Sequence, residues 1–341
     1  MARFILSRKK ALSQYKLVSS IADAISYSFK TNPEVGKILE RETDCYISMS
    51  SFSYLPFVKD KKRILFFPQA WNSTEIKKLF ALGIDKFVTD NQRDLDELVS
   101  FLGKSGKKAW ILLRMRMNEN TIYTGKHFVF GMTADEINRN IKTLAGNASI
   151  EKLGIHFHRK TQNTSEWSIR EELEDSLTEE TLKSISIINI GGGLPSAYNN
   201  SKPEMKSILR KLRQLKNWLN GKGINVIIEP GRFIAAPAVE LEARIKSVSE
   251  NNIIIDCSVY NCAMDTFVMN IRLIVKGETD ERKGKSYVIK GCTPDSIDIF
   301  RYNVYLKNPK AGDKIVFVNA GAYNFASDFD GLKKIPTVIV D

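Results

Sequence analysis

Short runs of β-branched and aromatic residues alternate with amphipathic helical patterns along most of the chain. The strand-like runs are bounded by Gly, Asp or Asn, and they occupy residues 24–29, 63–67, 86–90, 109–117, 152–158, 186–193 and 225–231. Helical patterns, with hydrophobic residues three and four positions apart, occupy residues 33–42, 73–83, 94–106, 133–146 and 201–223. This alternation predicts parallel β-α-β units.

The number of these units favours a closed barrel. About eight units in roughly 230 residues suit a (β/α)8 barrel better than an open sheet. We therefore predict an α/β protein in which residues 10–235 form a TIM-like barrel.

The pattern changes after residue 235. Strand-like runs with little helical pattern between them occupy residues 253–260, 267–275, 285–291, 313–318 and 336–340. They predict a C-terminal all-β domain. The opening run at residues 3–6 is a candidate strand of the same domain, so we expect the β domain to combine residues 1–9 and 236–341.

Composition and charge narrow the expected partners. The 341 residues are 43% hydrophobic and 26% charged, as in ordinary folded proteins. No apolar run approaches the roughly 20 residues of a membrane helix, and the first residues do not resemble a secretory signal. We expect a soluble, cytoplasmic protein without a membrane partner. The net charge of +12 comes from scattered Lys and Arg residues, so nucleic acid is not the expected partner, although anionic ligands would be attracted.

The cysteines and histidines do not form a metal motif. No CxxC pair occurs among the four cysteines, Cys45, Cys257, Cys262 and Cys292. This indicates reduced thiols rather than a zinc site or disulfides. His156 and His158 alternate along a predicted strand and share one face. No third ligand motif accompanies them, so we predict no metal.

Candidate chemistry gathers where the predicted barrel strands end, the usual place for function in this fold. Lys30, the glycines 191–193, Glu229 and Arg232 all lie at or just after the ends of strand-like runs. Consecutive glycines leave backbone N–H groups free to approach a phosphate, and an arginine adds charge. A lysine forms imines, an acidic residue keeps a pyridine nitrogen protonated, and an imidazole stacks on the ring. These are the parts of a pyridoxal-phosphate site, with a phosphosugar barrel enzyme as the rival.

Five ordered motifs, which cover nearly the whole chain, resemble those of the fold-type III pyridoxal-phosphate decarboxylases. This is the family of ornithine, diaminopimelate and arginine decarboxylases, which share an alanine racemase-like barrel. The motifs are YSFKTNP, GIHFHRKTQ, GGGLP, EPGRF and FVNAGAYNFASDFDGL. The resemblance implies the cofactor pyridoxal 5'-phosphate, with Lys30 as its Schiff-base residue and His158 stacked on its face.

The same resemblance assigns roles to the remaining motifs. It places Glu229 at the pyridine nitrogen of the cofactor. It implies that the cofactor phosphate is contacted by Gly191, Gly192, Gly193, Gly231, Arg232 and Tyr323.

The resemblance further implies a head-to-tail homodimer with shared active sites, in which GCTPDSID (residues 291–298) reaches the partner's lysine. In the family this motif has a cysteine, the candidate general acid, followed by an acidic residue. Pro294 stands at the cysteine's position here, Cys292 lies two residues earlier, and Asp295 fills the acidic position. Either Cys292 moves into place, or another group or water delivers the proton, or the chemistry differs. Cys292 as a buried small hydrophobic residue is the structural alternative.

The implied activity is decarboxylation of a basic diamino acid, with ornithine or lysine preferred, to a diamine and CO2. Asp295 favours a distal cation on the substrate. Arginine and carboxynorspermidine stay open, because residues 258–272 are similar to the carboxynorspermidine decarboxylase branch. Diaminopimelate is less favoured, since its distal carboxylate would need an arginine such as Arg159, Arg272 or Arg301.

A racemase of related fold and a non-catalytic pyridoxal-phosphate binder are the other classes of function that stay open. The long β domain and its closing motif favour the decarboxylase branch. A role in amino-acid metabolism, such as polyamine biosynthesis, follows from the resemblance.

Overall fold

The computed structural model describes residues 1–117 and 130–341, and the chain divides into two compact units. The barrel unit contains Lys16–Pro195 and Glu204–Gly231. The β unit contains Met1–Tyr15, Ser196–Pro203 and Arg232–Asp341. The domain limits expected from the sequence, at residues 10–235 and at 1–9 with 236–341, stay a prediction.

Eight parallel strands close the barrel, so the predicted (β/α)8 architecture is confirmed. The strands are β2 (Ala24–Ser28), β3 (Tyr46–Met49), β4 (Ile64–Phe66), β5 (Lys86–Thr89), β6 (Ala109–Arg114), β7 (Ile150–His156), β8 (Ile187–Asn189) and β9 (Asn225–Ile228). The ring closes where β9 pairs with β2, with Ala24 opposite Ile227. The sequence pattern did not single out β3, whose Ser48 interrupts the hydrophobic run.

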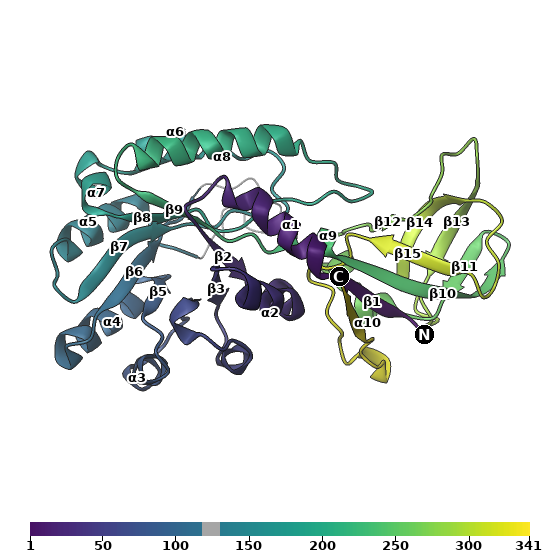
Figure 1. Cartoon of the computed structure of the whole chain (residues 1–341), viewed down its shortest axis with the longest axis horizontal. Helices are drawn as coiled ribbons and strands as arrows, with labels where there is room; N and C mark the ends of the chain where they lie inside the picture. The colour runs from purple at the N-terminus through teal and green to yellow at the C-terminus, as the bar shows by residue number, and fades with distance from the viewer. Residues whose placement is uncertain (118–129) are drawn as a thin grey trace. The chain divides into compact units, whose positions relative to one another are not determined.

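Helices lie around the outside of these strands (Figure 1). They are α2 (Pro33–Glu42), α3 (Ser73–Ala81), α4 (Gln92–Ser105), α5 (Ala134–Leu144), α6 (Ile169–Ser176), α7 (Glu179–Ser184) and α8 (Met205–Asn220), preceded in the chain by α1 (Arg8–Ser19). Several begin at polar caps: Asn32 accepts hydrogen bonds from the N–H groups of Glu34 and Val35, and Asn72 forms a capping box with Glu75. Such caps satisfy N–H groups that have no partner within the helix.

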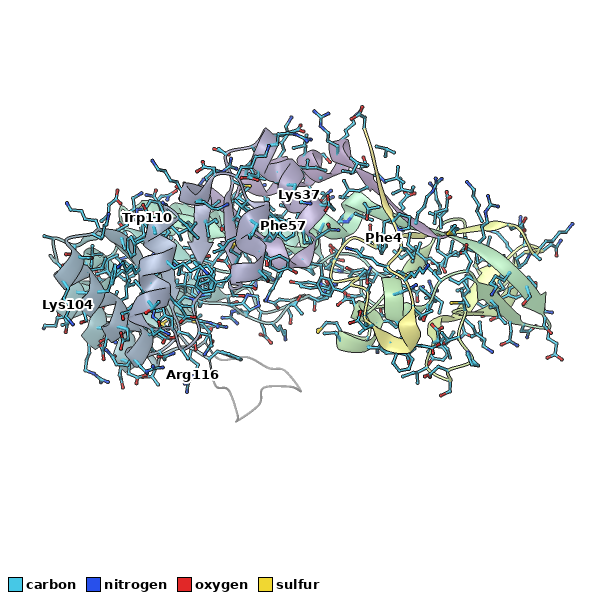
Figure 2. The ribbon with its side chains drawn as sticks, turned by 90° about the horizontal axis from the view of Figure 1, so that it is seen from below. Phe4, Lys37, Phe57, Lys104, Trp110 and Arg116 are labelled. Carbon is cyan, nitrogen blue, oxygen red and sulfur yellow. The ribbon has the colours of Figure 1, made fainter. Side chains whose placement is uncertain are left out.

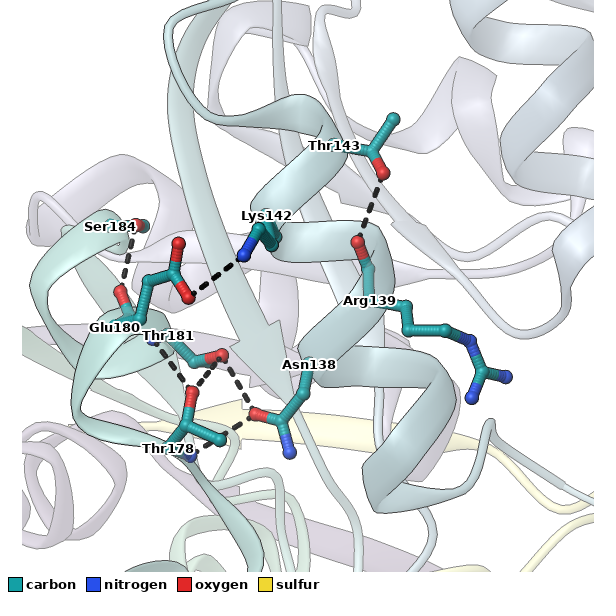
Figure 3. A network of polar contacts seen from close by, with 8 residues as sticks. All are labelled: Asn138, Arg139, Lys142, Thr143, Thr178, Glu180, Thr181 and Ser184. Carbon is teal, nitrogen blue, oxygen red and sulfur yellow. Dashed lines mark hydrogen bonds and ion pairs between the residues drawn. The ribbon is translucent and has the colours of Figure 1, made fainter.

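One asparagine side chain joins α5 to α7 (Figure 3). The Oδ1 atom of Asn138 accepts hydrogen bonds from the Thr178 N–H at 3.2 Å and from the Thr181 hydroxyl at 2.7 Å. Its Nδ2 atom donates to the carbonyl oxygen of Ser176 at 2.9 Å. Asn138 thereby fixes the turn between α6 and α7 against α5.

The barrel strands carry a hydrophobic cluster that contains Leu65, Val88, Trp110, Leu112, Ile187 and Ile227. Trp110, labelled in Figure 2, is the second residue of β6. The ammonium groups of Lys86 and Lys152 lie 4.9 and 4.2 Å from its ring centroids, within cation–π range. The carboxyl-terminal ends of the strands carry the polar residues described below.

The β unit is built on one mixed sheet with the order β12-β15-β10-β11-β13-β14, in which β1 lies beside β10 and β16 beside β1. Its strands are β1 (Arg3–Ser7), β10 (Val239–Ser249), β11 (Asn252–Ile255), β12 (Ile274–Val275), β13 (Lys285–Lys290), β14 (Ile299–Leu306), β15 (Lys314–Val318) and β16 (Thr337–Val340). The antiparallel pairing of β1 with β10 confirms that the N-terminal strand joins this sheet.

Two predicted strands of the β unit are wrong over part of their length. Residues 259–262 form the short helix α10 (Val259–Cys262), and residues 265–268 form α11 (Asp265–Val268). The unit also contains α9 (Arg232–Ala238). Ser258 and Asn261 make a capping box at the start of α10, which favours a helical turn over a continued strand.

Gly154 marks a close approach of two barrel strands and gives a test of this packing. A Cβ atom at Gly154 in β7 would lie 2.4 Å from the carbonyl oxygen of Ile187 in β8. We expect Gly154→Ala to lower the free energy of unfolding by about 1–3 kcal/mol, because the strands must separate.

Gly103→Ala in α4 is the matched control for Gly154→Ala. No heavy atom lies within 4 Å of the added methyl group there. The control should leave stability unchanged or raise it by up to about 1 kcal/mol. Urea unfolding measures both variants, and equal stability of the two would contradict the close approach.

Candidate active site

A buried carboxylate lies at the carboxyl-terminal end of the barrel strands. Glu229 follows β9, and only 8% of its surface is exposed. Its Oε1 atom accepts hydrogen bonds from the Ser48 hydroxyl at 3.0 Å and from Asn189 Nδ2 at 2.8 Å. The Nε2 atom of His156 lies 3.7 Å from Oε2.

These polar neighbours decide the charge of Glu229. Burial raises the pKa of its carboxyl group, but the nearby imidazole of His156 and the hydrogen bonds from Asn189 and Ser48 outweigh burial and hold that pKa below its ordinary value. The carboxylate is therefore ionised at neutral pH. Ser26 extends the polar set, since its hydroxyl oxygen lies 2.6 Å from that of Ser48.

His158 lies just after β7 and is held by the glycine turn. Its Nδ1 atom accepts a hydrogen bond from the Gly192 N–H at 3.2 Å. Burial, followed by the positive charge of Arg114, lowers the pKa of His158 to about 3. The imidazole is therefore neutral, and the glycine turn fixes its orientation.

The structure corrects one expectation about the glycines. The N–H groups of Gly191 and Gly192 are not free, because they donate to Asn189 Oδ1 at 2.9 Å and to His158 Nδ1. Glycine is required for another reason: Gly191 has φ +66°, and a Cβ atom there would lie 2.2 Å from the carbonyl oxygen of Phe157. Gly193 also has a positive φ, of +98°. The phosphate contacts of the three glycines stay a prediction.

Lys30 lies in the short 3₁₀ helix η1 (Phe29–Thr31) directly after β2, with its side chain exposed. Its charge contributes to the lowered pKa of His158, so both side chains belong to the same end of the barrel. The segment after Glu229 packs on this turn, since a Cβ atom at Gly231 would lie 2.1 Å from Thr31 Oγ1. Lys30, His158, the glycine turn and Glu229 are thus brought together within the barrel unit.

The β unit holds Arg232 and Tyr323. The buried guanidinium of Arg232 forms a two-pronged ion pair with Asp265, with one nitrogen–oxygen distance of 3.2 Å, and donates to the hydroxyl of Tyr198 at 3.0 Å. The Tyr323 ring lies 5.0 Å from the guanidinium. Burial raises the pKa of Tyr198 to about 12. Asp265 thus opposes the Arg232 charge, a pairing that the sequence pattern did not indicate.

The loop with Cys292, Pro294 and Asp295 is organised by a buried aspartate. Asp298 accepts hydrogen bonds from the Val259 N–H at 2.9 Å and from the N–H and hydroxyl of Thr293 at 3.1 and 2.8 Å. Cys292 is half-buried, and this burial raises the pKa of its thiol, which keeps its proton at neutral pH.

Sequence reasoning missed several residues of these networks, among them Ser48, Asn189, Asp265 and Asp298. Ser48 and Asn189 are polar residues inside hydrophobic strand patterns, and that interruption is the signal that would have found them. Within residues 1–117 and 130–341, no group of three or more His, Cys, Asp and Glu side chains is arranged to hold a metal ion. No helix among the described residues is long and apolar enough to cross a membrane.

A closed parallel barrel joined to a mixed β sheet, with an ionised carboxylate, a neutral imidazole and a lysine at the strand ends, is the arrangement of the fold-type III pyridoxal-phosphate enzymes. The chain belongs to the pyridoxal-dependent decarboxylases. The profile of their pyridoxal binding domain matches residues 54–236, and that of their C-terminal sheet domain matches residues 233–321. The expected cofactor, pyridoxal phosphate, and the expected enzyme class, an amino-acid decarboxylase, are confirmed.

Named relatives agree with this family. The diaminopimelate decarboxylase of Zymomonas mobilis is 25% identical over 296 residues, which span 82% of this chain and 70% of that protein. The diaminopimelate decarboxylase of Aquifex aeolicus is 28% identical over 258 residues, which span 70% of this chain but only 60% of that protein. The crystal structure of lysine decarboxylase from Selenomonas ruminantium shows the same fold, with a TM-score of 0.82 at 19% identity over 99% of this chain and 92% of that chain.

The lowered pKa of His158 predicts a pH-dependent stability of the cofactor-free chain. In the folded state the pKa is about 3, against an ordinary value of 6.5, so the unfolded chain binds the proton first as the pH falls. Stability is therefore lost below about pH 6.5. Between pH 7 and pH 5.5 the free energy of unfolding of the native chain should fall by about 1 kcal/mol more than that of the His158→Gln variant. Urea unfolding of both proteins at both pH values measures this difference. An equal loss of stability in the two proteins would contradict the prediction.

Proposed function

We propose that the chain decarboxylates an L-diamino acid with a cationic distal group, with ornithine or lysine as substrate and a diamine and CO2 as products. The observation that carries this proposal is that Arg159, Arg272 and Arg301 already make ion pairs or hydrogen bonds within the chain. Diaminopimelate would need one of them for its distal carboxylate, whereas a distal ammonium group would need an acidic residue such as Asp295.

Arg159 is buried and forms ion pairs with Glu166, at 3.7 Å, and with Glu172. Breaking such pairs would leave a buried charge without its partner, which is costly. This arginine is therefore not available to a substrate carboxylate.

The two arginines of the β unit are engaged as well. Arg301 is buried, pairs with Glu278 at 2.9 Å and donates to the carbonyl oxygen of Leu273. Arg272 donates to the carbonyl oxygen of Ile299 at 3.2 Å, and its guanidinium lies 5.0 Å from the Tyr302 ring. Diaminopimelate is the second candidate substrate, because two of the relatives are diaminopimelate decarboxylases.

The residues of the barrel unit fit the cofactor. The buried, ionised carboxylate of Glu229 suits a cationic ring nitrogen, and the buried hydroxyl of Thr31, beside Lys30, has no hydrogen-bond partner among the described residues. We propose that Lys30 binds the cofactor covalently, that Glu229 holds its ring nitrogen, and that the neutral imidazole of His158 packs on the ring. The bound cofactor supplies an acceptor for the electron pair that the departing CO2 leaves on the α-carbon.

A proton must then reach the α-carbon of the product. In the proposed head-to-tail homodimer, the loop of residues 291–298 completes the partner's site and brings Asp295 to the distal ammonium group. Pro294 carries no proton to donate. We propose the thiol of Cys292 as donor, because its raised pKa keeps it protonated, with bound water as the alternative.

The test is CO2 release by the purified, cofactor-loaded chain with L-ornithine, L-lysine, L-arginine, meso-diaminopimelate and carboxynorspermidine as separate substrates. We expect turnover of ornithine or lysine. Turnover of diaminopimelate alone would overturn the distal-cation proposal. Interconversion of amino-acid enantiomers without CO2 release would indicate a racemase, and cofactor binding without turnover of any substrate would indicate a non-catalytic binder.

Lys30→Ala should abolish both CO2 release and the visible absorbance band of the lysine-bound cofactor, because the substitution removes the amine proposed to form the covalent link. The exposed Lys108→Ala is the matched control and should change neither property. Absorbance spectra of both variants after removal of free cofactor make the comparison. A band that persists in Lys30→Ala would contradict the assignment.

Asp295→Asn should raise KM for lysine or ornithine about tenfold or more, because the neutral amide attracts a distal ammonium group less strongly. The visible cofactor band should be unchanged. Asp280→Asn, in an exposed turn of the β unit, is the control. Steady-state kinetics across the substrate panel measures the effect, and an unchanged preference for basic substrates would count against a role for Asp295.

A further inference from the structure

A second histidine of the barrel unit has no role in the function proposed above. His156 is the last residue of β7, and only 2% of its surface is exposed. It lies two residues before His158 in the chain. A titratable group at this depth needs an explanation, because an apolar side chain would fill the same space without desolvation cost.

The polar contact of His156 points to Glu229. Its Nε2 atom lies 3.7 Å from Oε2, the carboxylate oxygen that Ser48 and Asn189 do not bind. Its Nδ1 atom is buried and has no hydrogen-bond partner among the described residues. The remaining ring contact described for it is the edge-on packing of Phe67, with centroids 5.1 Å apart.

Burial, rather than the surrounding charges, favours a neutral imidazole at His156. Burial lowers its pKa, while Glu229 opposes this effect. Arg114 and Asp90 are the next charges to act on the ring, and they pair with each other at 2.9 Å. A neutral imidazole has one N–H, and placing it on Nε2 directs it at the carboxylate, whereas placing it on Nδ1 leaves a buried donor unpaired.

We propose that His156 is a positioning residue whose Nε2–H holds the Oε2 atom of Glu229, so that the carboxylate stays ionised and oriented toward the ring nitrogen of the cofactor. Two fixed donors hold Oε1, and a third on Oε2 leaves the carboxylate no free rotation. The inference rests on the proposed role of Glu229, but its test uses cofactor binding rather than turnover.

Three substitutions separate this role from simple packing. The amide nitrogen of Gln reaches the position of Nε2, and that of Asn reaches the position of Nδ1. His156→Gln therefore keeps the proposed N–H donor near Glu229. His156→Asn moves the donor to another position, and His156→Phe keeps an aromatic ring but removes the donor. If His156 only fills space, His156→Phe should be the best tolerated of the three.

The measurements are the dissociation constant of pyridoxal phosphate from the cofactor-free chain and the pH dependence of the bound cofactor's visible spectrum. We expect His156→Gln to match the native chain within about twofold. His156→Asn and His156→Phe should bind the cofactor about tenfold more weakly and shift the pH midpoint of the spectrum. Native affinity and spectrum in His156→Phe would overturn the proposal. A native chain that fails to bind the cofactor would instead overturn the role of Glu229.

The tautomer of His156 gives a second test that does not depend on how the variants fold. Nitrogen-15 labelling of the three histidines of the cofactor-free chain reports which ring nitrogen carries the proton. We expect a neutral, Nε2-protonated ring for His156 between about pH 7 and pH 8. The Nδ1-protonated tautomer would overturn the proposal.

Discussion

The ionised carboxylate of Glu229 in the barrel interior is the constraint on which the rest of the site depends. A charge at this depth is tolerated only when donors surround it. Separate strands supply them: Ser48 from β3, His156 from β7 and Asn189 from β8. The barrel strands also carry the hydrophobic cluster around Trp110, whereas the donors to Glu229 lie toward the carboxyl-terminal ends of their strands.

The glycine turn extends this constraint to the neighbouring histidine. Asn189 bonds Glu229 through its amide nitrogen and the Gly191 N–H through its oxygen, so one side chain connects the carboxylate to the turn. The next N–H in the turn, that of Gly192, fixes Nδ1 of His158. The orientation of the imidazole and the position of the carboxylate are therefore coupled through backbone that only glycine can form at these close contacts.

Sequence patterns predicted the barrel and the strand ends that carry Lys30, His158 and Glu229, because local periodicity and ordered motifs determine both. They did not predict that Ser48 and Asn189 meet at Glu229. Convergence of residues from separate strands depends on closure of the barrel, which no local pattern encodes. The N–H groups of Gly191 and Gly192 were expected to be free, because the sequence does not reveal that they donate to Asn189 and His158 within the turn. Residues 259 and 260 were expected to end a strand because their β propensity is high, but the capping box of Ser258 favours the helical turn α10 there.

The departure at Pro294 separates two tasks of one loop. Asp298 holds the loop through the N–H groups of Val259 and Thr293, and Asp295 accepts from the Ile297 N–H, so no described bond of the loop needs an N–H at position 294. Proline there removes a side-chain proton donor and leaves these bonds intact. The proposed recognition of the substrate by Asp295 is thus structurally independent of the proposed proton delivery. A change in the proton donor therefore does not require a change in the substrate's distal group.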